Sequence, residues 1–187
     1  MLTAVLKNKS TAVKITVKGA ISVLMIVLAV ALPQIAHIAG GAAAGAVYLP
    51  MYAPALIAGC ILGWQWGLGV GALSPLASFA FTSLLLDSAM PAAARLPYMV
   101  VELAAFGLVA GLFSKKIAKN ALFAFPAVIA AQVAGRLIYF ISAVIFGQSA
   151  AAVWGVIESG LTGLYIQAAI VPVVVLLLSL AVKNDRD

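Results

Sequence analysis

The chain consists of long apolar runs separated by short segments rich in charge, glycine or proline. Between Lys18 and Asp87 there is no Asp, Glu, Lys or Arg. In the last third of the chain only Arg136 and Glu158 interrupt the apolar sequence before the charged C-terminus. Runs of about 20 apolar residues have the length of a membrane-spanning helix. Because these runs lack the alternation of a barrel strand, they predict helices.

Charges, prolines and glycines divide the sequence into six predicted membrane-spanning helices, which form a single domain over residues 1–187. The predicted spans are about 16–38, 50–65, 67–86, 97–115, 121–146 and 160–182. The segments 40–50, 87–97, 114–120 and 147–160 are expected connectors, and the break at GWQWG (63–67) is very tight. Residues 1–15 form a basic N-terminal segment and 183–187 a short tail. The expected fold class is an all-α membrane protein.

Composition supports a membrane protein. Hydrophobic residues make up 65% of the chain and charged residues 9%, and the mean hydropathy is +1.19. A soluble domain carries about 25% charged residues, so no water-soluble core could hide this much apolar surface. The first apolar run is followed by no clear small-residue cleavage motif, and we expect it to remain as an anchor. The single cysteine, Cys60, lies within an apolar run and is expected to serve packing.

The positions of lysine and arginine predict the orientation, because these residues are enriched in cytoplasmic connectors. With six helices, Arg95 is the one basic residue in a connector on the outer side. The basic residues on the opposite side are Lys7, Lys9, Lys14, Lys18, Lys115, Lys116, Lys119, Lys183 and Arg186. Both termini are therefore predicted to be cytoplasmic. The net charge of +6 then reflects topology and attraction to anionic membrane lipid, and no nucleic-acid partner is expected.

Small residues recur four apart in the second, third and fourth predicted helices. They are Gly59, Gly63, Gly67, Gly71, Gly107 and Gly111. This spacing lets helix backbones approach closely in lipid, so we expect these glycines to pack the bundle. Trp64 and Trp66 at the tight break suit the membrane interface, where an indole keeps one polar edge in water.

Polar residues inside the spans are candidate functional residues, because ionisable groups are costly within a membrane. Counted from the cytoplasmic lysines at 1.5 Å of rise per residue, Glu102 lies at roughly 20 Å and Gln167 at roughly 24 Å. On the same scale Arg136 lies at roughly 25 Å and His37 at roughly 28 Å. Four helices thus place polar groups in the outer half of the membrane, whereas the inner half has almost none.

Further hydrogen-bonding side chains lie at the same level. Gln132 and Tyr139 share the helical face of Arg136, at i−4 and i+3, and Tyr98 shares the face of Glu102. This distribution predicts a polar cavity that is open to the outside and closed toward the cytoplasm. The alternative is an Arg136–Glu102 ion pair that locks the bundle and binds no ligand.

The sequence contains no constellation typical of an enzyme. One His and one Cys lie far apart, and one His with two carboxylates at membrane level gives no metal-ligand spacing such as H-E-x-x-H. There is no phosphate-binding loop, so the chain alone is not expected to couple ATP hydrolysis to transport. We therefore expect neither catalysis nor a cofactor bound by this chain.

Four segments together resemble one family. They are PQIAHIAG (33–40), YLPMYAPALIAGCILGWQWGLGVGALSPLAS (48–78), PYMVVELAAFGLVAG (97–111) and AGRLIYF (134–140). The apolar loop into the second helix, the tight hairpin followed by a mid-helix proline, and E-L-x-x-x-G in the fourth helix look like substrate-binding S components of energy-coupling factor (ECF) transporters. These are small six-helix vitamin-capture proteins of prokaryotic membranes.

The resemblance implies an outward cavity that is formed by the outer parts of the helices and capped by the connectors 40–50 and 87–97. It also implies docking on a membrane-embedded T component that carries two cytoplasmic ATPases, followed by toppling within the bilayer. The family's A-x-x-x-A docking pattern has its nearest match here in Ala12, Thr16 and Ala20. The expected substrate-binding residues are His37, Tyr48, Tyr52, Tyr98, Glu102, Gln132, Arg136, Tyr139 and Gln167.

The ligand is expected to be a vitamin or a cofactor precursor. Charges of both signs, aromatic rings and amides fit a small heteroaromatic vitamin such as pyridoxine or a pyrimidine precursor. Pantothenate, lipoate, cobalamin and queuosine precursors remain open. A second hypothesis is a cell-envelope scaffold of the shape-determining MreD type, in which polar groups only lock helices, and a third is an intramembrane enzyme.

Overall fold

The computed structural model of this chain describes residues 10–86 and 89–184, and within them it contains helices and no strand. The α-helices are α2 (Thr11–Gly40), α3 (Ala42–Tyr48), α4 (Tyr52–Leu62), α5 (Trp64–Leu85), α6 (Leu96–Leu112), α7 (Ser114–Lys119), α8 (Ala124–Ile145), α9 (Ala150–Ser159) and α10 (Leu161–Asn184). Two short 3-10 helices, η1 (Ala93–Arg95) and η2 (Ala121–Phe123), precede α6 and α8. The predicted all-helical fold is confirmed.

Six of the helical segments are long and apolar enough to cross a membrane, as expected for a multi-pass membrane protein. They are Thr11–Gly40, Ala44–Leu62, Trp64–Leu85, Ala93–Leu112, Ala121–Ile145 and Leu161–Ala181. Most boundaries agree with the predicted ones to within a few residues. Lys7, Lys9 and Arg186, which the sequence predicts to be cytoplasmic, lie outside the described residues.

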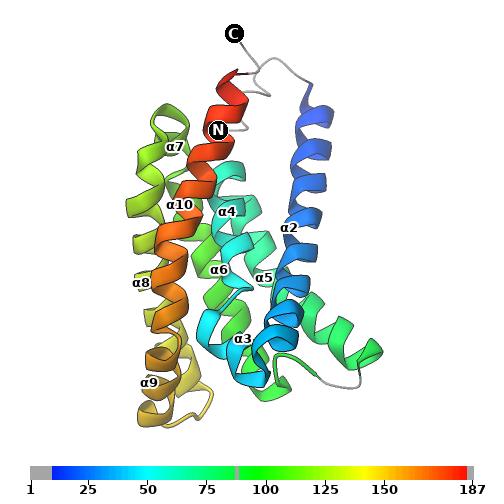
Figure 1. Cartoon of the computed structure of the whole chain (residues 1–187), viewed down its shortest axis with the longest axis vertical. Coiled ribbons are helices and arrows are strands. Elements are labelled where there is room, and N and C mark those ends of the chain that lie inside the picture. Colours follow the sequence, from blue (N-terminus) through cyan, green and yellow to red (C-terminus); the bar gives the residue numbers. More distant parts are fainter. Residues whose placement is uncertain (1–9, 87–88, 185–187) are drawn as a thin grey trace.

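The start of α2, the end of α10 and the lysine-bearing α7 lie at one end of the bundle (Figure 1). The opposite end contains α3, α9 and the connector that leads into η1 (Figure 1). We call these the lysine end and the connector end. Because the number of spans is even, the start of α2 and the end of α10 lie at the same end of the bundle. That this end is cytoplasmic stays a prediction.

Three of the expected connectors contain short α-helices of their own, and the fourth, 87–97, contains η1. The alanine-rich parts of segments 40–50 and 147–160 form α3 and α9, and the basic segment 114–120 forms α7. Alanine has the highest helix propensity, which favours helical turns in the two alanine-rich segments. Helix α3 overlaps the start of the second candidate span, Ala44–Leu62. The Ser149 hydroxyl caps the start of α9 by accepting a hydrogen bond from the Ala152 backbone N–H.

A single residue, Gly63, separates α4 from α5, which confirms the tight break. Its φ of 100° lies in a region that favours glycine, and it allows two apolar helices to reverse direction without a loop. At the start of α2, the Lys18 ammonium donates a hydrogen bond to the Leu62 carbonyl (3.2 Å). This bond satisfies one carbonyl at the end of α4, which has no partner within its own helix.

The predicted glycine contacts are present at the lysine end. A Cβ added to Gly67 or Gly107 would collide with the backbone of the other residue, and one added to Gly71 would collide with the Leu103 carbonyl. Similarly, a Cβ on Gly111 would meet the Trp64 backbone. Helix α6 therefore touches the start of α5 backbone to backbone, as small residues allow in lipid.

Candidate functional site

A buried ion pair joins α6 to α8 between the two ends of the bundle. Arg136 Nη1 lies 3.0 Å from Glu102 Oε1, and the Glu102 side chain is fully buried. Charges that leave water are stable only when they are paired and supplied with further hydrogen-bonding partners. The predicted proximity of these two residues is therefore observed, although it fits both the cavity hypothesis and the scaffold hypothesis.

Tyr52, at the start of α4, completes this charged cluster. Its hydroxyl donates a hydrogen bond of 2.6 Å to Glu102 Oε2, so the carboxylate has partners on two helices. The Arg136 guanidinium lies over the Tyr52 ring at 5.4 Å from its centroid and over the Tyr139 ring at 5.7 Å. Aromatic faces attract a cation, and the attraction is larger where water is excluded. The charge pair and Tyr52 thus hold α4, α6 and α8 together, and the Tyr139 ring covers the guanidinium from its own helix.

Arg136 is incompletely satisfied within the described part of the chain. Its Nε and Nη2 atoms are buried without a hydrogen-bond partner. Nη2 faces Gly160, where an added Cβ would lie only 3.0 Å from it. The absence of a side chain at Gly160 therefore leaves the guanidinium room between α8 and the start of α10.

The second span is interrupted beside this cluster. Between α3 and α4 the backbone leaves the helix, and Leu49 adopts a left-handed conformation with φ 50°. Gln167 of α10 donates hydrogen bonds from Nε2 to the carbonyls of Tyr48 (3.2 Å) and Leu49 (2.8 Å). Non-helical backbone at membrane depth is tolerated where it is satisfied in this way or lines a cavity.

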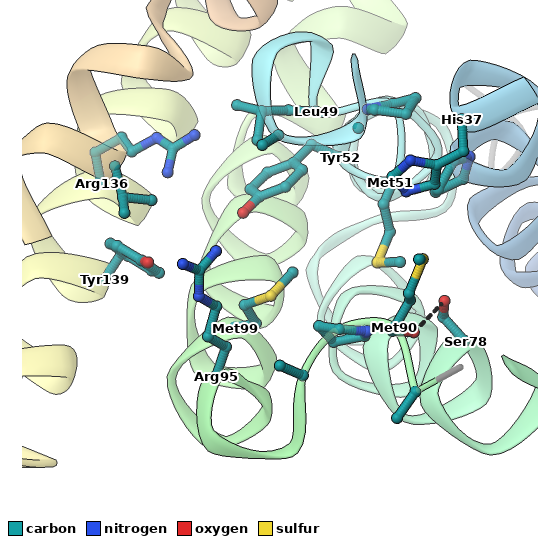
Figure 2. Close-up of a pocket in the computed structure, with 18 residues that line it drawn as sticks. His37, Leu49, Met51, Tyr52, Ser78, Met90, Arg95, Met99, Arg136 and Tyr139 are labelled. Atoms are coloured by element: carbon teal, nitrogen blue, oxygen red, sulfur yellow. Dashed lines mark hydrogen bonds between the residues drawn. The ribbon is translucent and has the colours of Figure 1, made fainter. Parts of the chain in front are cut away.

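A partly enclosed cavity of about 420 Å³ lies at the connector end, between the interrupted span and the connector before η1. Figure 2 shows its wall, with Tyr52 and Leu49 on one side, Arg136 and Tyr139 on another, and Met90 and Arg95 from the η1 connector below. Small-molecule sites have volumes of about 300–1,000 Å³. This cavity is therefore large enough for a compact organic ligand.

Of the nine predicted site residues, four line the cavity: His37, Tyr52, Arg136 and Tyr139. Glu102 lies behind Arg136 and does not reach the cavity surface. Tyr98 is buried and packs edge-on against Tyr139, with 5.3 Å between ring centroids. The ring therefore supports a lining residue without lining the cavity itself.

The other three predicted residues also lie outside the cavity wall. The Gln132 amide donates to the Leu164 carbonyl (2.9 Å) and ties α8 to α10. Gln167 holds the interrupted backbone, and the Tyr48 side chain is half exposed. Depth and helical face placed these side chains near the site, but their contacts are with protein backbone or with the outside of the bundle.

Several cavity residues were missed by the sequence prediction. Arg95 and the three methionines Met51, Met90 and Met99 line the cavity. Arg95 had one signal, as the single basic residue in an outer connector, whereas the methionines had none. In a chain this apolar, the sequence pattern does not indicate whether an apolar residue faces lipid, the protein core or a cavity.

Hydrogen bonds fix the η1 connector to α5. The Met90 carbonyl accepts from the hydroxyls of Ser78 (2.9 Å) and Thr82 (3.2 Å), and the Met90 N–H donates to the Thr82 hydroxyl (2.8 Å). Ser78 also lines the cavity (Figure 2). These bonds hold the connector against α5 at the cavity wall.

The described residues contain no group of three or more His, Cys, Asp and Glu placed to hold a metal ion. Cys60 is fully buried in the apolar core, as expected for packing. Comparison with protein-family models, with curated proteins and with solved structures returned no match to this chain. The site is therefore interpreted from its own geometry.

Proposed function

We propose that this chain is the substrate-binding S component of an ECF-type importer in the cytoplasmic membrane of a prokaryote. The observation that supports the proposal is the cavity at the connector end. Its volume suits a small molecule, and its wall contains charged and aromatic side chains. The opposite end is packed through glycine contacts. A binding site that is open on one side of a membrane and closed on the other is what a capture protein requires.

The connectors that border the cavity support the same proposal. Residues from 45 to 52 and from 89 to 95 contribute to its wall, and these are the two connectors that the family resemblance places over the substrate. The chain would bind a vitamin or cofactor precursor from outside. A T component and two ATPase subunits would then supply the energy, since this sequence has no phosphate-binding loop.

The scaffold hypothesis has one observation in its favour. Arg136 Nη1, the Glu102 carboxylate, the Tyr52 hydroxyl and the amide nitrogens of Gln132 and Gln167 have partners within the protein. A bundle whose polar groups only lock helices would have such contacts. It would not require a cavity of ligand size, and we therefore rank it second.

Native mass spectrometry of the detergent-purified chain tests the proposal directly. We expect one small molecule bound per chain, and a return of the bound mass after the stripped protein is incubated with a small-molecule extract of bacterial cells. The chain alone in liposomes should bind without accumulating the compound against a gradient. A protein that never carries a bound mass would support the scaffold, and accumulation by the chain alone would contradict an S component.

A further inference from the structure

We propose that the cavity takes a small organic monoanion, whose carboxylate is bound by Arg95 and whose apolar body packs against a methionine wall. This inference rests on the proposed function, that the cavity holds a small-molecule ligand. It departs from pyridoxine, the example that the sequence favoured, which has no carboxylate, and it favours carboxylates such as pantothenate and lipoate, which the sequence left open.

The first argument is the balance of charge around the cavity. Its described lining includes Arg95, Arg136 and His37 but no Asp or Glu. Arg136 is neutralised from behind by Glu102 at 3.0 Å. Within residues 10–86 and 89–184, Arg95 has no ion pair, and Glu158 on α9 lies outside the cavity wall. The wall therefore has one guanidinium charge that the described residues leave uncompensated.

The second argument is the direction of that guanidinium. Arg95 ends η1, and its side chain rises from the connector into the cavity, toward the level of Tyr52 and Tyr139 (Figure 2). A guanidinium can donate two parallel hydrogen bonds to a carboxylate. The Tyr139 hydroxyl makes no hydrogen bond within the described residues, so it offers another donor from α8 on the same wall.

The third argument is the character of the remaining surface. Met51, Met90 and Met99 come from three different segments and line the same cavity. Figure 2 shows the Met51 and Met99 thioethers in the space between Tyr52 and the η1 connector. Thioethers are polarizable and adapt to irregular apolar or aromatic groups. The cavity thus combines a cationic point with an apolar wall, which fits a carboxylate on an apolar body.

The single uncompensated charge also favours a carboxylate over a phosphate ester. A phosphate monoester carries about −1.5 to −2 charges at pH 7. Bound to Arg95, it would keep about one negative charge that no other residue of the described cavity wall neutralises, since Arg136 is already paired with Glu102. One carboxylate matches one guanidinium.

The test uses a bacterial small-molecule extract separated at pH 7 into a fraction retained by an anion-exchange resin and an unretained fraction. The stripped, detergent-purified chain is incubated with each fraction and weighed by native mass spectrometry. We expect a bound mass from the retained fraction only. This mass should survive prior treatment of the fraction with phosphatase.

Two variants assign the anion to Arg95. Arg95→Gln should lower the apparent affinity for the retained fraction by roughly ten- to a hundredfold, as expected for loss of a charged hydrogen bond. Lys119→Gln removes one positive charge from an exposed position on α7 and should bind as the wild type does. Melting temperatures of both variants should match the wild type, because Arg95 is exposed and has no ion pair within the described residues.

The outcomes separate this inference from the proposed function. A bound mass from the unretained fraction alone, loss of the mass after phosphatase, or normal binding by Arg95→Gln would overturn the monocarboxylate and leave a binding protein. No bound mass from either fraction would overturn the binding function itself, and the present inference with it.

Discussion

In the lysine-end half of the bundle, α4, α5 and α6 meet through Gly59, Gly67 and Gly107, and their backbones touch. In the connector-end half, Tyr52, Ser78 and Met99 of the same helices line a cavity of about 420 Å³. The same three helices therefore pack closely in the lysine-end half, the closed half, and border a cavity in the connector-end half, the open half.

The difference shows how a membrane protein makes a cavity without a soluble domain. Lipid offers no hydrophobic driving force between helices, so close packing has to come from small residues. Where the small residues stop, larger side chains hold the helices apart, and the charged cluster of Arg136, Glu102 and Tyr52 lies beside the resulting space. The closed half is expected to keep the open half in position.

The largest expected difference between the two halves is their accessibility from outside the cell. Cysteine placed at exposed Gln148, next to α9, should react with a membrane-impermeant maleimide on intact cells, and cysteine at exposed Ala118, in α7, should not. The wild type serves as the unlabelled control because Cys60 is fully buried. The reverse pattern would place the cavity on the cytoplasmic side and contradict the predicted orientation.

The charged cluster beside the cavity should show the next largest effect. Glu102→Gln and Arg136→Met each leave one buried charge unpaired, and each should lower the free energy of unfolding by about 3–5 kcal/mol. The double variant should recover most of that stability, because no charge remains. Thermal unfolding in detergent measures all three proteins.

Ligand binding by the same three proteins shows whether Arg136 and Glu102 only hold the helices together or also help to form the ligand site. If Arg136 helps to form the ligand site, the stable double variant should bind the small molecule at least about tenfold more weakly, because a charged contact is lost. A double variant that is stable and binds normally would reduce the pair to a structural role. Native mass spectrometry gives the occupancy at matched ligand concentration.

Disruption of the glycine contacts in the lysine-end half should lower the free energy of unfolding by less than an unpaired buried charge does. The loss of packing should, however, extend over more residues. Gly107→Leu forces α5 and α6 apart and should destabilise the protein by about 1–3 kcal/mol, in the range of overpacked cores. Gly19→Leu on α2 is the matched control, since a Cβ there has no neighbour within 4 Å. Equal melting temperatures for both variants would argue against backbone contact at Gly107.

The smallest effect is expected at the interrupted span. Gln167→Leu removes two hydrogen bonds to the Tyr48 and Leu49 carbonyls and should lower stability by about 1–2 kcal/mol. Gln34→Leu is a suitable comparison, because the Gln34 Nε2 atom is buried without a partner and its removal should be neutral or stabilising. A larger loss at Gln34 than at Gln167 would contradict this account of the interrupted backbone.

The sequence by itself determined the helical class, the six spans and the glycine contacts. Each of these follows from distances along the chain: the length of an apolar run matches the thickness of a bilayer, and glycines four apart lie on one helical face. The pairing of Arg136 with Glu102 was also predictable, because few ionisable residues lie inside the spans and each needs a partner. The tight break between the second and third spans was predictable from the lack of any polar segment there, although the predicted spans met at residues 65–67 and the observed turn is at Gly63.

Only the tertiary structure decided which polar side chains reach the cavity. Gln132 and Gln167 have the depth and the face of ligand-binding residues, yet they bond to carbonyls of neighbouring segments, whose positions no helical period encodes. Arg95, Met51 and Met90 come from connectors and helix starts that meet only when the bundle closes. Hydropathy measures how readily a residue leaves water, and for this reason it cannot tell a side chain that faces lipid from one that faces a ligand.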